Sequence, residues 1–149
     1  MVAKSARRQM CDRWRELAEQ VRNGLYFVKR GAINWTTFPF KDEQGGIALM
    51  IDDGQLLRTQ RERGMKPARC SMEMFRSLPD LNAIPAIDDG LMDELLDDAE
   101  EILTELMKSR TASNDPIVFR IDANSVRFVE AHDTEIKVQG IVVTFNLEY

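Results

Sequence analysis

The stretch that decides the fold spans residues 117–149 and reads IVFRIDANSVRFVEAHDTEIKVQGIVVTFNLEY. Its apolar and polar residues alternate, which is typical of half-buried strands. We predict strands at IVFRID and VRFVEA, with a turn at Ala123-Asn124-Ser125 between them. After a short link at residues 132–134, residues 135–149 would form one strand of roughly 50 Å at ~3.3 Å per residue, well beyond the usual 5–6 residues or about 20 Å. A neighbouring subunit typically completes a strand longer than its own domain requires, so the pattern indicates an assembly protein.

The apolar pattern of this last strand changes phase in the middle. Ile136 and Val138 share one face, whereas the apolar residues after Gly140 have the opposite parity. A bulge at Gly140 would restore a single apolar face and bend the strand. The alternative is a strand that faces the core first and a neighbour afterwards.

Two amphipathic helices precede this region. Residues 5–24 carry Met10, Trp14, Leu17 and Val21 at helical spacing, and Gly24 provides a C-terminal stop. The second helix opens at Asp88-Asp89 and runs to about residue 108, with carboxylates in its first turns, where they suit the helix dipole. Short strands are predicted at 25–28, 33–40, 47–51, 55–60 and 68–76, with a hairpin turn at 52–54. The expected fold is α+β: one domain, residues 1–149, with two main helices packed on a small antiparallel sheet and a long C-terminal strand.

Composition excludes several classes of protein. The chain is 44% hydrophobic and 30% charged, as expected of a globular domain, and its apolar runs are shorter than the ~18 residues of a membrane span. The amino terminus lacks the apolar core of a secretory signal. Cys11 and Cys70 have no spacing that indicates a disulfide framework or a zinc site, so we expect free thiols, a reducing compartment and no cofactor.

The charge is distributed unevenly along the chain. Residues 1–78 hold 15 Lys/Arg and 9 Asp/Glu, a net of +6, whereas residues 79–149 hold 5 and 16, a net of −11, which together give −5. This polarity favours pairing within the fold or between copies arranged head to tail. It argues against nucleic-acid binding by the whole domain.

No residues converge on catalysis, so we expect a protein that is not an enzyme. His132 is the only histidine and lies in a polar link; phosphate-binding loops and nucleophile motifs are absent from the sequence. One alternative is a Mg²⁺-dependent nuclease, in which Asp122 and Glu135 would hold the metal and Lys137 would orient water. Glu135 and Lys137 alternate with apolar residues, however, and the solvent-facing side of an amphipathic strand would show the same pattern.

We instead predict three subunit or partner contacts. The first is a basic loop, formed by Arg58, Arg61, Arg63, Lys66 and Arg69. The second is the acidic face of the second helix, represented by Asp93, Asp97 and Glu101. The third is the end of the chain, represented by Val143, Phe145, Leu147 and Tyr149.

The order of these elements, ending in GIVVTFNLEY at residues 140–149, resembles that of the tail terminator, or tail completion, proteins of long-tailed bacteriophages. The likeness spans nearly the whole chain but consists mostly of element order and size. The resemblance implies a hexameric ring that caps the tail tube, stops its polymerisation and presents a head–tail joining surface. The implied partners are further copies, the tail tube protein and a connector or neck protein, with DNA passing through the lumen without sequence recognition and no membrane.

The implied location is the virion, at the head–tail junction, after assembly in the host cytoplasm. The resemblance supplies no catalytic residues. The alternative within this class is another neck, head-closure or minor tail connector protein, because the loop at residues 78–86 and the charged amino-terminal helix are not diagnostic of tail terminators.

Overall fold

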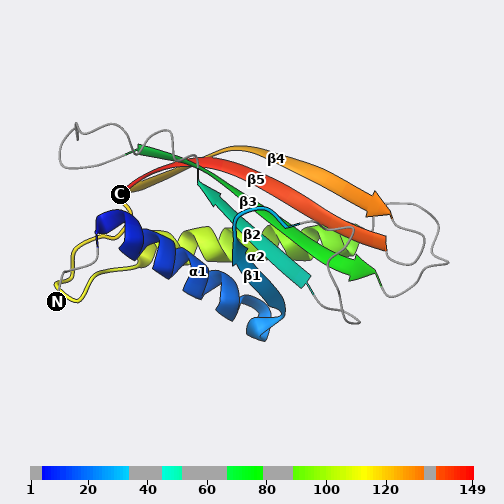
Figure 1. Ribbon diagram of the computed structural model, residues 1–149, viewed down its shortest axis with the longest axis horizontal. Coiled ribbons are helices and arrows are strands. Elements are labelled where there is room, and N and C mark those ends of the chain that lie inside the picture. Colours follow the sequence, from blue (N-terminus) through cyan, green and yellow to red (C-terminus); the bar gives the residue numbers. More distant parts are fainter. Residues whose placement is uncertain (1–4, 34–44, 52–66, 79–88, 133–136) are drawn as a thin grey trace.

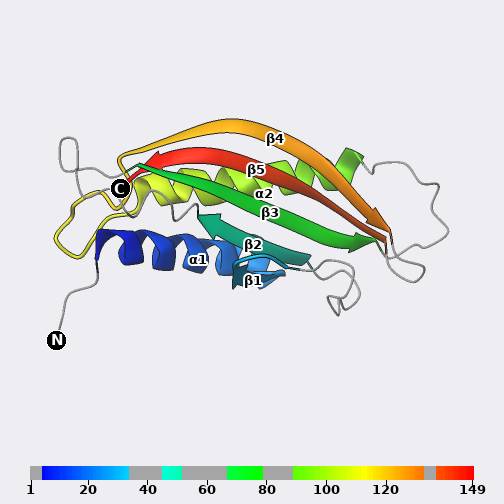
Figure 2. The same ribbon diagram turned by 45° about the horizontal axis from the view of Figure 1, so that its top comes forward.

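The chain folds into a helical layer on one face of a sheet, as Figure 1 and Figure 2 show. The computed structural model describes residues 5–33, 45–51, 67–78, 89–132 and 137–149. Within these, the helices are α1 (Ala6–Gly24) and α2 (Asp89–Lys108), and the strands are β1 (Tyr26–Arg30), β2 (Gly45–Ile51), β3 (Pro67–Leu78), β4 (Arg120–His132) and β5 (Lys137–Glu148). The predicted α+β class, with two helices on a sheet and a long C-terminal strand, is confirmed.

The described strands have the order β1-β2-β3-β5-β4. The pairs β2/β3, β3/β5 and β4/β5 are antiparallel as predicted, but β1 and β2 are parallel, so the sheet is mixed. A parallel pair requires the chain to return to its starting edge through a dozen or more residues, and residues 31–44 are long enough for that crossover. The predicted strand at 33–40, the turn at 52–54 and the strand at 55–60 lie wholly or mostly outside the described residues.

The core lies between the helices and the sheet. The side chains of Met10, Trp14 and Leu17 in α1 and of Leu95 in α2 are buried against alternating residues of β3 and β5. The ring of Trp14 meets that of Phe145 edge-on, with centroids 5.4 Å apart and an interplanar angle of 79°, which is a favourable aromatic arrangement. The predicted apolar face of α1 is therefore its buried face, and it packs directly on the C-terminal strand.

Helix α1 begins where the sequence predicts. The Ser5 side chain accepts a hydrogen bond from the backbone N–H of Arg8 at 3.2 Å, which caps the first turn. The end of α1 is less regular, because Val21 leaves the helical conformation and Arg22 and Asn23 adopt φ angles of 49° and 54°. These left-handed residues place the Arg22 side chain against α2.

The two strands predicted before the final one form a single strand. Residues 120–132 are continuous in β4, and the predicted turn at Ala123-Asn124-Ser125 is a β-bulge, because Ala123 pairs with Phe145 and Ser125 with Thr144. The turn prediction is therefore wrong. Small polar residues suit a bulge as well as a turn, and pairing with the long β5 keeps the chain extended.

The final strand is central in the sheet. β5 pairs with β3 on one side and with β4 on the other, and the register runs past Gly140 unbroken on both sides. The predicted bulge at Gly140 is therefore wrong. Val138 lies on the face away from the helices and is buried there, as is Phe75 of β3, which lies diagonally across from it. The change of phase therefore means that β5 has buried apolar side chains on both faces at this end of the strand.

Gly140 is required by the close approach of its neighbours. A Cβ atom at this position would lie 2.4 Å from the Met74 carbonyl oxygen and 2.5 Å from Cδ1 of the Phe75 ring. We expect Gly140→Ala to lower the free energy of unfolding by about 1–3 kcal/mol, because backbone or ring must move. Urea unfolding measures this change.

A matched control for this substitution lies at Gly90, which is exposed in the first turn of α2. Gly90→Ala should leave stability unchanged or raise it by up to about 1 kcal/mol, because alanine favours helix more than glycine does. Equal losses at the two positions would contradict the steric explanation for Gly140.

Candidate interaction surfaces

The acidic face of α2 projects into solvent. The carboxylates that form it are those of Asp93, Asp97, Glu100 and Glu101, and we call them the acidic ridge. All four residues are exposed, and none of them forms an ion pair with another described residue. They lie on the opposite side of the helix from the buried Leu95 and Ile102. The three predicted residues, Asp93, Asp97 and Glu101, therefore belong to one continuous surface.

The predicted basic loop is mostly outside the described residues, which include only Arg69. Arg69 is exposed in β3 between Ala68 and Cys70, whose side chains are buried beneath the helices. Because neighbouring residues in a strand point to opposite faces, Arg69 lies on the face of the sheet away from the helices. The acidic ridge and Arg69 consequently occupy opposite sides of one molecule and can meet only between two copies.

The predicted contact through the end of the chain needs correction. Phe145 is 0% exposed, and Val143, Leu147 and Tyr149 are also buried in the core of the same chain. Their apolar side chains pack under the helices because β5 is central in the sheet. They hold the subunit together and do not form its surface.

The edge of the sheet lies instead at β4, which pairs with β5 and with no other described strand. Val126 and Phe128 are 44% and 50% exposed, although they lie directly opposite the buried Val143 and Ile141. Residues directly opposite in an antiparallel pair share a face, so both point to the helix side of the sheet. They remain exposed because the helical layer does not cover this edge. Sequence alternation alone did not identify them as a surface.

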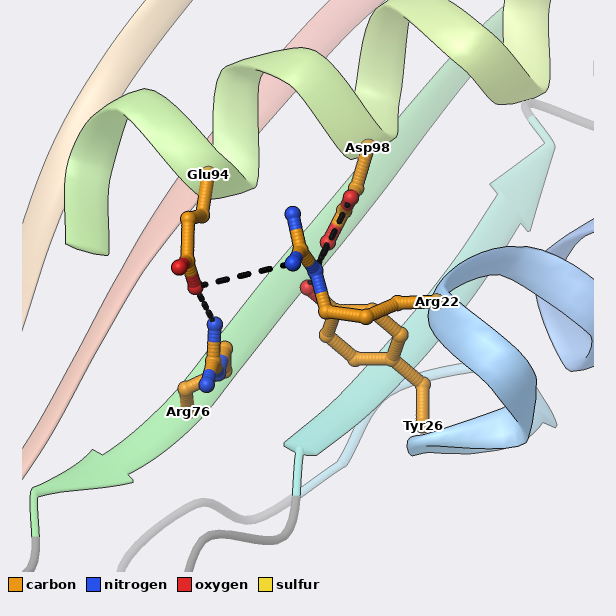
Figure 3. Close-up of polar contacts among 5 residues, drawn as sticks. All are labelled: Arg22, Tyr26, Arg76, Glu94 and Asp98. Carbon is orange, nitrogen blue, oxygen red and sulfur yellow. Dashed lines mark hydrogen bonds and ion pairs between the residues drawn. The ribbon is translucent and has the colours of Figure 1, made fainter. Parts of the chain in front are cut away.

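A polar cluster joins both helices to the sheet, as Figure 3 shows. Asp98 of α2 is 3% exposed. Its carboxylate accepts hydrogen bonds from Nε of Arg22, at 2.8 and 3.1 Å, and from the Tyr26 hydroxyl. Arg76 of β3 pairs with Glu94, which also lies 3.9 Å from the Arg22 guanidinium. Buried charge of this kind is tolerated only with such partners.

The cluster perturbs the ionisation of two of its members. Burial, followed by the hydrogen bond to Asp98, raises the pKa of the Tyr26 hydroxyl well above its usual value. The hydrogen bond to Asp98 raises the pKa of the Arg22 guanidinium. Tyr26 therefore stays protonated as the donor and Arg22 stays charged, so the cluster is a fixed structural tie between α1, α2 and the sheet.

Sequence reasoning missed this cluster, although one signal for it was present. Asp98 follows Leu91 by seven residues and precedes Ile102 by four, which places it on the flank of the apolar stripe. A carboxylate in that position needs a buried partner. The partner, Arg22, could not be identified, because it lies 76 positions away in the chain and local spacing carries no information on that contact.

The nuclease alternative is not supported by the placement of its residues. Asp122 is exposed in β4 opposite Asn146, and it forms an ion pair of 2.8 Å with Arg120. Lys137 pairs with His132 at the other end of the same ladder, nine residues and so roughly 30 Å along β5. Glu135 lies outside the described residues. Asp122 and Lys137 therefore do not form one site.

Chemical groups typical of enzymes are sparse in the described part of the chain. A shallow open hollow of about 360 Å³ lies between α1 and the segment after α2, lined by residues that include Arg13, Glu16 and Ser109. Its polar groups bond to one another, since Arg13 donates to the Ser109 hydroxyl at 2.9 Å and pairs with Glu16 at 3.1 Å. The described residues contain no group of three or more potential metal ligands.

The two cysteines are free and buried. Burial, with a smaller contribution from the nearby Cys11, raises the pKa of the Cys70 thiol to about 12. Thiolate is the reactive form of cysteine, so Cys70 is inert in the folded chain.

Comparison with known proteins adds no family to this description. No family model matches the chain, and no curated protein matches it. Neither described helix is long and apolar enough to cross a membrane.

Proposed function

We propose that this chain is a structural subunit of a bacteriophage tail, of the tail terminator type, that forms a ring on the end of the tail tube. The ring would stop polymerisation of the tube and present the joining surface for the head. The observation that best supports this proposal is the separation of the exposed acidic ridge from Arg69 on opposite faces of one molecule.

The acidic ridge and Arg69, the one described residue of the predicted basic loop, are opposite in charge but cannot meet within one subunit. A contact between two different patches of identical subunits is heterologous, and it closes into a ring when the rotation per subunit permits. Charge complementarity of this kind steers association and fixes its register. The tightly packed core, in contrast, indicates a subunit that folds by itself before it assembles.

The direct test measures assembly with and without tail tube protein. Multi-angle light scattering and negative-stain images should show rings of the purified protein, or rings that form only on tubes, and the added protein should limit tube length. A chain that stays monomeric and never binds tubes would contradict the proposal. Rings that bind a head connector but leave tube length unchanged would favour a neck component instead.

Reversing charge on the acidic ridge should weaken the ring. In Asp97→Lys/Glu101→Lys, two exposed carboxylates become cations that repel the predicted basic loop of the next copy, so we expect at least about tenfold weaker association. Light scattering over a concentration series measures this shift.

The matched control is Glu16→Lys/Glu19→Lys in α1, which makes the same change in net charge. It breaks the ion pairs of Glu16 with Arg13 and of Glu19 with Arg15, and the hydrogen bond that Gln20 donates to Glu16. Such pairs contribute little to stability, so the control should fold and assemble normally. Equal weakening by the two variants would mean that net charge, rather than the ridge, controls assembly.

A further inference from the structure

The free edge of β4 is an interaction surface in its own right. β4 has 13 residues and is bonded to β5 along one side, whereas the other side meets no described strand. An open edge presents unpaired N–H and C=O groups, which are a template for another strand. An edge of this length is long enough to pair with a complete strand of another molecule.

Apolar residues flank this edge on both β4 and α2. We call Val126 and Phe128 of β4, together with Leu96, Leu103 and Met107 of α2, the apolar margin. The α2 residues share one side of the helix, at spacings of seven and four, on the flank away from Asp98 and therefore away from α1. Met107 is exposed, and Leu96 and Leu103 are only partly buried. An additional strand on β4, with its own helix beneath it, would cover this apolar margin.

The bulge in β4 bears on which strand pairs best with the free edge. Ile121 and Ala123 lie opposite Leu147 and Phe145, so they face the helices; after the bulge Val126 and Phe128 do so. The pattern of faces thus shifts by one residue at the bulge. The regular strand β5 matches these faces on both sides because one extra residue of β4 is taken up in the bulge between Ala123 and Ser125. A second β4, antiparallel and with its bulge opposite, also matches them on both sides, and neither strand then has an extra residue.

Charge then selects between the two registers that place the bulges opposite one another. In one, Arg120 lies opposite Arg127 of the second copy, which is repulsive. In the other, Asp122 lies opposite Arg127 of the second copy, Ile121 opposite Phe128 and Ala123 opposite Val126. Two-fold symmetry makes each of these pairs twice. Asp122 and Arg127 are both exposed on the face away from the helices, and Asp122, which pairs with Arg120 of its own chain at 2.8 Å, would pair with Arg127 in the dimer.

We infer that β4 pairs antiparallel with β4 of a second copy of this chain, in the register with Asp122 opposite Arg127. The result is one continuous sheet across two subunits, with the helical layers of both on the same face and the two apolar margins joined. The contact is isologous and does not use the acidic ridge, so it is independent of the proposed ring.

Sedimentation of the full chain over a concentration series tests the association. We expect a reversible dimer, and we expect Phe128→Lys to raise its dissociation constant by about tenfold or more, since each dimer loses two apolar pairs. The matched control is Phe27→Lys in β1, where the phenylalanine is 46% exposed at the far end of the described sheet. This control should leave the dimer intact. A strictly monomeric chain, or a dimer that Phe128→Lys does not weaken, would overturn the inference.

Cross-linking tests the register. Ala123→Cys/Val126→Cys should give a disulfide-linked dimer under mild oxidation, because directly opposite Cβ atoms lie about 4.5–5.5 Å apart. Ile121→Cys/Val126→Cys, which matches the rejected register, should not. The native cysteines are buried and should not compete. A cross-link in the second variant alone would overturn the assigned register.

Charge exchange gives a second reading of the same register. Arg127→Asp should weaken the dimer, and adding Asp122→Lys should restore it. Failure of this rescue would contradict the Asp122–Arg127 pair. If the protein forms rings but gives no cross-link, the proposed function stands and this inference is wrong. If it gives the cross-linked dimer but never forms rings or binds tubes, this inference stands and the proposed function is wrong.

Discussion

Replacing Phe145 with alanine is expected to lower the free energy of unfolding by about 3–5 kcal/mol. The side chain is completely buried in β5, and its ring packs edge-on against Trp14 of α1. Truncation removes the apolar contact between the C-terminal strand and the helical layer and leaves a cavity that the surrounding core can fill only in part. Urea unfolding followed by circular dichroism measures the loss.

Phe128 provides the matched control, since it is the same residue type on the neighbouring strand but 50% exposed. Phe128→Ala should change the stability of the monomer by less than about 1 kcal/mol, provided that unfolding is measured at low protein concentration, where the dimer has dissociated. Equal losses at Phe145 and Phe128 would contradict the assignment of β5 to the core and β4 to the surface. The pair of variants thus separates residues that hold the subunit together from residues available to a partner.

Replacing Asp98 with alanine is expected to lower the free energy of unfolding by about 2–4 kcal/mol. The substitution removes a charged hydrogen-bond acceptor and leaves the buried Tyr26 hydroxyl without its partner. This decrease should be smaller than the one caused by breaking a fully buried ion pair, because the side chain of Arg22 is 34% exposed and water can reach it. Left-handed residues at the end of α1 would also lose the contact that holds them.

Two further variants sharpen this test. Asp97→Ala removes the adjacent but exposed carboxylate and should change stability by no more than about 0.5 kcal/mol. Asp98→Asn keeps an acceptor for Tyr26 but not the charge, so its loss should fall between those of Asp97→Ala and Asp98→Ala. If Asp97→Ala and Asp98→Ala were equally stable, the polar cluster would not be a structural tie.

Local patterns predicted most of the elements but not their neighbours. The stripes of α1 and α2 are long and periodic, and their bounds are close to those predicted from residues 5–24 and 88–108. Strands β2 and β3 were also located, although β3 continues past Phe75 to Leu78. Periodicity determines which face of an element is apolar, but it carries little information on which strand lies beside which.

The position of β5 illustrates this limit. Its length was recognised, but the length was attributed to an edge that continues into another subunit. One signal favoured the opposite assignment: four consecutive residues, Gly140-Ile-Val-Val, lack polar groups, whereas residues 120–130 carry two arginines, an aspartate and a glutamate. Charged residues are typical of edge strands and unbroken apolar runs of central ones.

The sequence by itself determined the helices, the extended C-terminal region, the acidic ridge and the opposed charge of the two halves, because these depend on the spacing of residues close together in the chain. Only the tertiary structure decided that β5 is central and β4 open, that β1 and β2 run parallel, and that Asp98 meets Arg22. Those outcomes depend on contacts between residues distant in the sequence, such as Asp98 and Arg22, which are 76 positions apart. Their free energy comes from burying apolar surface and from satisfying buried polar groups in three dimensions, which no local pattern records.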